Sequence, residues 1–213
     1  MIALRSVHHR YGATHALTVP ELHVGQGGRA LVLGPSGSGK TTLLHVLAGL
    51  LRPTEGHVEV AGQDLLALSE AARDRFRGRH IGIVFQRLHL VGALTVAQNV
   101  RLARTLAGLP PDETRLRQTL AALELEDRAN AFPHQLSAGQ QQRVAIARAV
   151  ANAPRVLLAD EPTASLDDAR AEAVLALLVA QAEATGATLL VATHDRRIMG
   201  AFPLRFDLAP VAP

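Results

Sequence analysis

The chain has 213 residues, 48% hydrophobic and 19% charged, which is typical of one globular domain with room for a subdomain. Its net charge is +3, and no run of basic residues predicts a nucleic-acid-binding tail, so no nucleic acid partner is expected. The absence of cysteine excludes a disulfide scaffold. We expect no signal peptide and no transmembrane span, because no charged N-terminal segment precedes an apolar one and no apolar stretch reaches about 18 residues.

Alternating apolar runs and helical patterns predict an α/β fold with a parallel sheet. In chain order, the predicted strands are 29–33, 81–85, 155–159 and 188–192. The predicted helices are 41–51, 95–107, 112–123, 137–151 and 168–185, the last closed by Gly186. A small antiparallel β region is expected near the N-terminus.

The segment between residues 87 and 153 carries three of the predicted helices and no predicted strand. We therefore expect an all-helical subdomain, about 87–153, inserted into a core made of residues 1–86 and 154–213. On this interpretation the whole chain, 1–213, is one domain.

A glycine-rich segment directly follows the first predicted strand. Its spacing, G-x-x-x-x-G-K-T, is that of a P-loop, in which backbone N–H groups surround nucleotide phosphates. Lys40 is the only lysine of the chain, and its slim stem suits a narrow loop better than a guanidinium. In such loops the lysine reaches the β/γ-phosphates and the next hydroxyl holds Mg²⁺. The predicted nucleotide-binding residues are Gly34, Pro35, Ser36, Gly37, Ser38, Gly39, Lys40, Thr41 and Thr42, and Thr41 is also a predicted metal ligand.

Polar residues follow the other predicted strands where each of them ends. Gln86 follows 81–85, Asp160 and Glu161 follow 155–159, and His194 follows 188–192 after one threonine. Ligands bind at this edge of doubly wound sheets. We expect Asp160 to organise Mg²⁺ and Glu161 to act as general base for a water molecule. Taken alone, Glu161 could cap a turn and His194 could be a structural histidine.

A second phosphate-binding element is predicted at the start of the helix 137–151. Ser137 and Gln140 have the spacing of a capping box, and a helix N-terminus suits an anion. Because the P-loop already accounts for the phosphates, this second element predicts a nucleotide held between two copies of the chain.

Together these motifs resemble the nucleotide-binding subunit of ATP-binding cassette (ABC) systems, over essentially the whole chain. The stretch 34–42 resembles the Walker A motif, and 156–161 resembles Walker B with its glutamate. The family signature L-S-G-G-Q matches 136–140, with Ala138 in place of its first glycine. We expect this methyl group to slow closure at most. The resemblance makes Ser137, Ala138, Gly139 and Gln140 nucleotide contacts across a dimer.

The resemblance also assigns roles that the residues alone do not. Gln86 corresponds to the Q-loop glutamine, a catalytic residue and metal ligand, and His194 to the switch histidine. Asp167 belongs to a D-loop, Ser165–Leu166–Asp167. Tyr11, the only tyrosine, corresponds to the aromatic that stacks on adenine, although packing against the sheet is an equally good interpretation.

The function implied by the resemblance is ATP binding and hydrolysis with Mg²⁺, in a head-to-tail homodimer that drives a transmembrane permease. The implied location is cytoplasmic, peripheral on the inner face of the cell membrane. The runs 83–90 and 158–167 resemble subunits of lipoprotein-release, macrolide-export and FtsE-type systems. The sequence ends 19 residues after His194, so we expect no regulatory C-terminal domain.

Three alternative functions stay open at this point. A soluble ABC ATPase acting on DNA or ribosomes would usually carry a coiled-coil insertion or two cassettes. An FtsE-like subunit would transmit force without transport. A P-loop kinase would explain Lys40 but neither His194 nor the segment 137–140.

Overall fold

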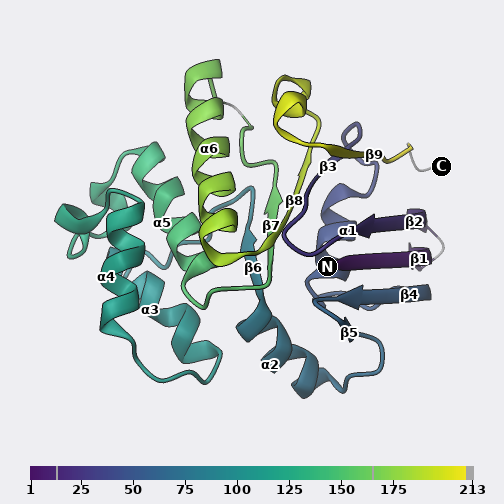
Figure 1. Ribbon diagram of the computed structural model, residues 1–213, viewed down its shortest axis with the longest axis horizontal. Coiled ribbons are helices and arrows are strands. Elements are labelled where there is room, and N and C mark those ends of the chain that lie inside the picture. The colour runs from purple at the N-terminus through teal and green to yellow at the C-terminus, as the bar shows by residue number, and fades with distance from the viewer. Residues whose placement is uncertain (13, 165, 210–213) are drawn as a thin grey trace.

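Two β-sheets lie at the centre of the computed structural model, which describes residues 1–12, 14–164 and 166–209. The parallel sheet has the order β6-β7-β8-β3-β9, as Figure 1 shows near the middle of the molecule. Its strands are β3 (Arg29–Leu33), β6 (Ile81–Val84), β7 (Val156–Asp160), β8 (Thr188–Thr193) and β9 (Leu204–Asp207). The antiparallel sheet has the order β2-β1-β4-β5, with β1 (Ile2–Tyr11), β2 (Thr14–Val24), β4 (Glu55–Val60) and β5 (Gln63–Asp64). This arrangement confirms the predicted α/β fold with an N-terminal antiparallel region.

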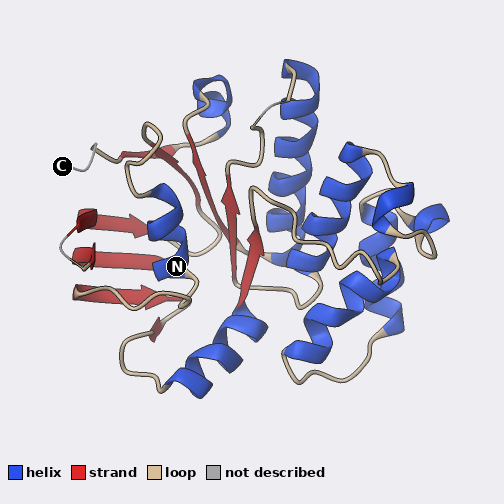
Figure 2. Cartoon of the chain, turned by 180° about the vertical axis from the view of Figure 1, so that it is seen from behind, coloured by secondary structure: helices blue, strands red, loops and turns tan. Residues whose placement is uncertain are grey.

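The helices are distributed unevenly between the two ends of the molecule (Figure 2). Helices α3, α4 and α5 gather at the end opposite the antiparallel sheet, whereas α1 lies between the two sheets. The six helices of the described residues are α1 (Lys40–Leu47), α2 (Glu70–His80), α3 (Val96–Leu106), α4 (Glu113–Ala122), α5 (Ala138–Val150) and α6 (Asp168–Thr185). Short 3₁₀ helices cover Glu126–Arg128, Pro133–Gln135 and Arg196–Ala201. In the described part of the chain, no helix combines the length and apolar character that a membrane span requires.

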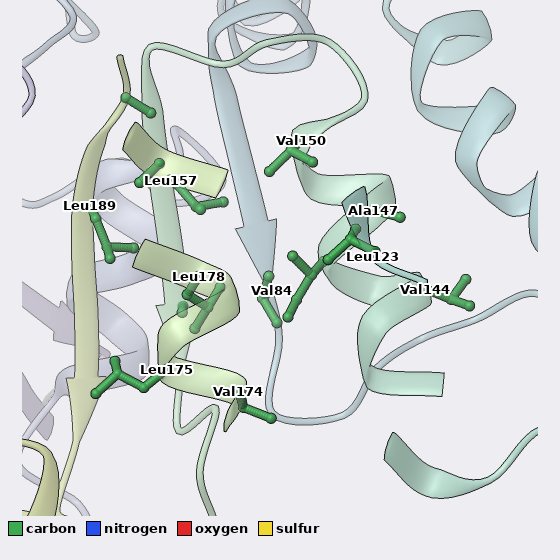
Figure 3. Close-up of a cluster of buried hydrophobic side chains, with 14 of the residues drawn as sticks. Val84, Leu123, Val144, Ala147, Val150, Leu157, Val174, Leu175, Leu178 and Leu189 are labelled. Atoms are coloured by element: carbon green, nitrogen blue, oxygen red, sulfur yellow. The ribbon is translucent and has the colours of Figure 1, made fainter. Parts of the chain in front are cut away.

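The central strands β7 and β8 are buried along their whole length because both faces of the parallel sheet are covered. Leu157 and Leu189 belong to a cluster that also contains side chains of α5 and α6, which Figure 3 shows around Leu178. Their neighbours Leu158 and Leu190 belong to a second cluster, with α1 and the antiparallel sheet. The first cluster runs without a break from the sheet into α3, α4 and α5. The division into a core and a subdomain at residues 87–153 stays a prediction.

Helix α1 begins at the P-loop and ends sooner than predicted. Gly39, with φ of 92°, precedes its first residue, and a side chain there would collide with the carbonyl oxygen of Ala16. The predicted end at Leu51 is wrong, because Gly49 takes a left-handed conformation (φ 66°) and terminates the helix after Leu47.

Helix α2 is not among the elements that the sequence predicts. Its N-cap is Ser69, whose side chain accepts a hydrogen bond from the N–H of Ala72. The helix is attached to the rest of the fold by arginine side chains and not by an apolar stripe. Arg73 and Arg77 donate hydrogen bonds to the carbonyl oxygen of Gly49 at the end of α1. Apolar periodicity therefore gave no signal for this helix.

Candidate active site

The carboxyl ends of four parallel strands meet beside the P-loop. Strand register places Leu33 opposite Thr193, and Asp160 opposite Ala192. The residues that follow these strands therefore converge, as the sequence analysis predicted. They form a cleft of about 420 Å³ whose lining is Ala16, Ser36, Gly37, Gly39, Lys40, Thr41, Thr42, Gln86, Glu161 and His194.

Lys40 lies almost buried in this cleft, with 7% of its side chain exposed. Its ammonium donates to the carbonyl oxygens of Gly34 and Pro35, at 2.7 and 3.0 Å. A third partner is Glu161, whose Oε1 lies 3.3 Å from Nζ. The only lysine of the chain is thus folded back over its own loop, in contact with the candidate general base.

Glu161 is the acidic group of the cleft with the most hydrogen-bond and ion-pair contacts. Its Oε2 accepts hydrogen bonds from Thr193 Oγ1 at 2.7 Å and from the N–H of His194 at 3.3 Å. Its Oε1 lies 3.0 Å from Nδ1 of His194. Burial favours a higher pKa for Glu161, but the hydrogen bonds from His194 and Thr193 and the charge of Lys40 outweigh it and lower the pKa. The carboxylate is therefore ionised at neutral pH and able to accept a proton.

Asp160 lies one residue earlier and is buried beneath the P-loop, 5% exposed. Its Oδ2 accepts a hydrogen bond of 2.8 Å from Thr41 Oγ1, while Oδ1 is buried without a hydrogen-bond partner in the described part of the chain. Burial is the main cause that raises the pKa of this carboxyl group. A buried oxygen without a partner, next to a hydroxyl, fits a cation beside Thr41 and Asp160.

The oxygen atoms of Thr41 and Asp160 are compatible with a magnesium ion that also binds phosphate. Among the described residues, no group of three or more His, Cys, Asp or Glu side chains could hold a metal ion by itself. Mg²⁺ is usually bound by one or two protein oxygens together with phosphates and water. The residues present therefore fit a magnesium ion that arrives with a nucleotide, and Gln86 lines the same cleft.

The start of helix α5 lies outside this cleft. Ser137 Oγ accepts from the N–H of Gln140 at 3.3 Å, and Gln140 Oε1 accepts from the N–H of Ser137 at 3.0 Å, so the predicted capping box is present. Ser137, Ala138 and Gly139 are exposed, and none of them lines the cleft. The chain does not bring its own helix tip to its own P-loop cleft.

Two further predicted site residues are not part of the cleft lining. Tyr11 ends β1 with 52% of its surface exposed and its ring 4.7 Å from that of His9. Asp167 caps α6 by accepting a hydrogen bond of 2.9 Å from the N–H of Arg170. Ser165 of the predicted D-loop lies outside the described residues.

The structure also brings two residues to the site that the sequence analysis did not assign. Thr193 donates to Glu161 and accepts a hydrogen bond of 2.9 Å from the N–H of Asp195. Gln142, on α5, donates to the carbonyl oxygen of Pro162 at 2.5 Å, close to Glu161. The position of Thr193 directly before His194 was a usable sequence signal, whereas no sequence pattern indicated the contact between Gln142 and Pro162.

Comparisons with known proteins identify relatives of this chain. A family model described as "ABC transporter" matches residues 17–164. The lipoprotein-releasing system ATP-binding protein LolD of Rhodopseudomonas palustris (strain BisB5) is 44% identical, covering 85% of this chain and 79% of that protein. The methionine import ATP-binding protein MetN of Myxococcus xanthus (strain DK1622) is 47% identical, covering 94% and 62%. The macrolide export ATP-binding/permease protein MacB of Salmonella choleraesuis (strain SC-B67) is 45% identical, covering 82% and 27%.

A solved structure has nearly the same fold. The ATP-binding cassette MJ0796, in a dimeric post-hydrolysis state bound to ADP and Pi, superposes with a TM-score of 0.87 and is 37% identical. The match covers 99% of this chain and 95% of that chain. The chain belongs to the ABC transporter family, as a subunit that binds and hydrolyses ATP.

Proposed function

We propose that two copies of this chain bind two ATP molecules head to tail and hydrolyse them to drive a membrane partner. The main observation in support is that the capped, exposed tip of α5 lies outside the chain's own cleft. A helix tip with free N–H groups attracts phosphate. In a two-fold dimer the tip of one copy would face the cleft of the other, so that each nucleotide has contacts from both chains.

The cleft supplies the first half of each site. The glycine-rich loop, from Gly34 to Thr42, surrounds the phosphates with backbone N–H groups. Lys40 exchanges its contacts with Gly34, Pro35 and Glu161 for the β/γ-phosphate oxygens. Thr41, Asp160 and Gln86 would hold magnesium, which would neutralise phosphate charge when bound. Tyr11 stacks on adenine from the end of β1.

The second half and the water complete the site. Ser137, Ala138, Gly139 and Gln140 of the partner copy approach the γ-phosphate through the first turn of α5, and Asp167 lies at the dimer interface. Release of Lys40 to the phosphates frees Glu161 to accept a proton from water. His194, 3.0 Å from Glu161, holds that carboxylate in place and contacts the γ-phosphate. Positioning and charge neutralisation carry most of such a reaction.

A groove next to Gln86 suits a helix of the membrane partner. It has a volume of about 620 Å³ and lies among α2, β6 and α3. Exposed leucines border it, with Leu106 78% and Leu50 46% exposed, and Phe85 lies directly before Gln86. An amphipathic cytoplasmic helix of a permease would cover these side chains and sense the movement of Gln86. The chain would then be cytoplasmic, peripheral on the inner face of the membrane.

Light scattering on the Glu161→Gln variant tests the proposal. With ATP and Mg²⁺ the variant should become a dimer, because closure precedes the proton transfer that the variant lacks. Glu21→Gln, the same change at an exposed position of β2, should stay monomeric under turnover. A Glu161→Gln protein that binds ATP and remains a monomer would refute the shared site.

A further inference from the structure

Arg197 joins two segments that lie 29 residues apart in the sequence. It belongs to the 3₁₀ helix Arg196–Ala201, directly after the loop that carries His194. Its guanidinium binds both carboxylate oxygens of Asp195, Nε to Oδ1 at 2.9 Å and Nη2 to Oδ2 at 2.7 Å. The remaining nitrogen, Nη1, pairs with Asp168, the first residue of α6, and Nη2 also donates to the carbonyl oxygen of Leu166 at 3.4 Å.

Asp195 extends this network towards the catalytic carboxylate. Its side chain is only 10% exposed, and its Oδ2 accepts a hydrogen bond of 3.0 Å from the fully buried Thr163. Its N–H donates to Thr193 Oγ1, which in turn donates to Glu161. The hydrogen bond from Arg197 is the main cause that lowers the pKa of Asp195 to about 2, so that this partner stays ionised. The chain of contacts runs unbroken from Glu161 to the start of α6.

The guanidinium suits this position better than an ammonium would. It offers five N–H donors in a fixed fork, and here it serves two carboxylates and one carbonyl oxygen at once. An isolated ion pair with exposed partners contributes little to stability, and Asp168 is 81% exposed. The arrangement is therefore better explained by geometry, because a bidentate pair fixes orientation as well as distance.

We propose that Arg197 is a positioning residue that fastens the loop of His194 to the segment 166–168, so that both move as one unit. The inference rests on the proposed function, in which His194 contacts the γ-phosphate in the chain's own cleft and Asp167 of the same chain lies at the dimer interface. On closure the rigid pair would carry His194 to the γ-phosphate as 166–168 meets the partner copy. Without Arg197 the two segments would close independently, and fewer encounters would reach the reactive arrangement.

Steady-state ATPase kinetics on Arg197→Ala test the catalytic consequence. We expect kcat to fall about tenfold while KM stays within about twofold, because the P-loop contacts are intact. Arg128→Ala, which removes an exposed arginine from the 3₁₀ helix Glu126–Arg128, should match the wild type. Arg197→Lys should recover only part of the rate. A kcat equal to that of Arg128→Ala would overturn the proposal.

Two further measurements separate positioning from a loss of folding. Asp168→Asn should lower kcat less than Arg197→Ala, and the double variant should be no slower than Arg197→Ala alone; additive effects would overturn the proposal. Amide hydrogen exchange at 166–170 should rise at least about fivefold in Arg197→Ala and not in Arg128→Ala. Unchanged exchange there would overturn the fastening even if the ATPase rate fell. A wild-type protein that does not hydrolyse ATP would contradict the proposed function. The hydrogen-exchange data would still show whether Arg197 fastens the segment 166–168.

Discussion

Replacing Glu161 by glutamine is the change whose effect on turnover the structure defines best. The amide has nearly the same size, and its oxygen can still accept from Thr193 Oγ1 and the N–H of His194, so the loop should keep its shape. What disappears is the carboxylate group that would accept a proton from water. General-base catalysis contributes about 10²–10⁴-fold, and we expect a loss of about 10³-fold in kcat, or about 4 kcal/mol in the barrier.

The same change removes the counter-ion of Lys40. The Glu161 carboxylate lies 3.3 Å from Nζ, and both side chains are less than 10% exposed. The nucleotide-free variant should therefore unfold more easily, by about 1–3 kcal/mol, because a buried ammonium keeps only two carbonyl partners. Phosphate release measures the rate, and urea unfolding measures the stability. A kcat within tenfold of the wild type would refute the assignment of Glu161 as the base.

Three other predictions follow from the same geometry. Lys40→Ala should weaken ATP binding about 100-fold by calorimetry, because a charge-assisted contact to phosphate is lost; unchanged affinity would contradict the P-loop assignment. Asp160→Asn should raise the Mg²⁺ concentration needed for half-maximal ATPase rate about tenfold or more, and turnover that persists in excess chelator would argue against a metal at Thr41 and Asp160. Asp195 has a pKa of about 2, below its ordinary value of 3.8, so its contribution to stability is present above about pH 4 and is lost as pH falls through 2. Asp195→Asn removes the charge that pairs with Arg197, so it should lower the free energy of unfolding at pH 7. The expected loss is only about 1 kcal/mol, because Arg197 is nearly half exposed and solvent screens the pair. A stability difference between variant and wild type that does not shrink below pH 3 would contradict this.

The parts of the fold that follow from apolar patterning were predictable from the sequence. The predicted strand 29–33 is β3, and the predicted helix 168–185 is α6, with Gly186 in the left-handed conformation that closes it. The runs 81–85 and 188–192 differ from β6 and β8 by one residue at the C-terminal end, and 155–159 is shifted by one residue from β7 at both ends. Buried strands between two covered faces leave little ambiguity.

The parts that depend on tertiary contacts were not predictable in this way. Helix α2 is stabilised by Arg73 and Arg77 bonding to Gly49, a residue more than 20 positions away, and no periodic pattern encodes such a contact. The cleft residues converge as predicted because parallel strands end at one edge of the sheet. The contact of Lys40 with Glu161 could not be anticipated, since it depends on how the lysine side chain folds back over its own loop.

The central claim is that each ATP is bound by two copies of the chain, and mixing two inactive variants tests it most directly. Lys40→Ala disables the P-loop. Gly139→Asp places a negative charge at the tip of α5, where a side chain meets nothing within 4 Å and the fold should be unaffected. In a head-to-tail dimer of one copy of each, one site has both defects and the other has none. An equal mixture should therefore regain about one quarter of the wild-type ATPase rate, whereas a mixture no more active than its separate components would contradict the shared site.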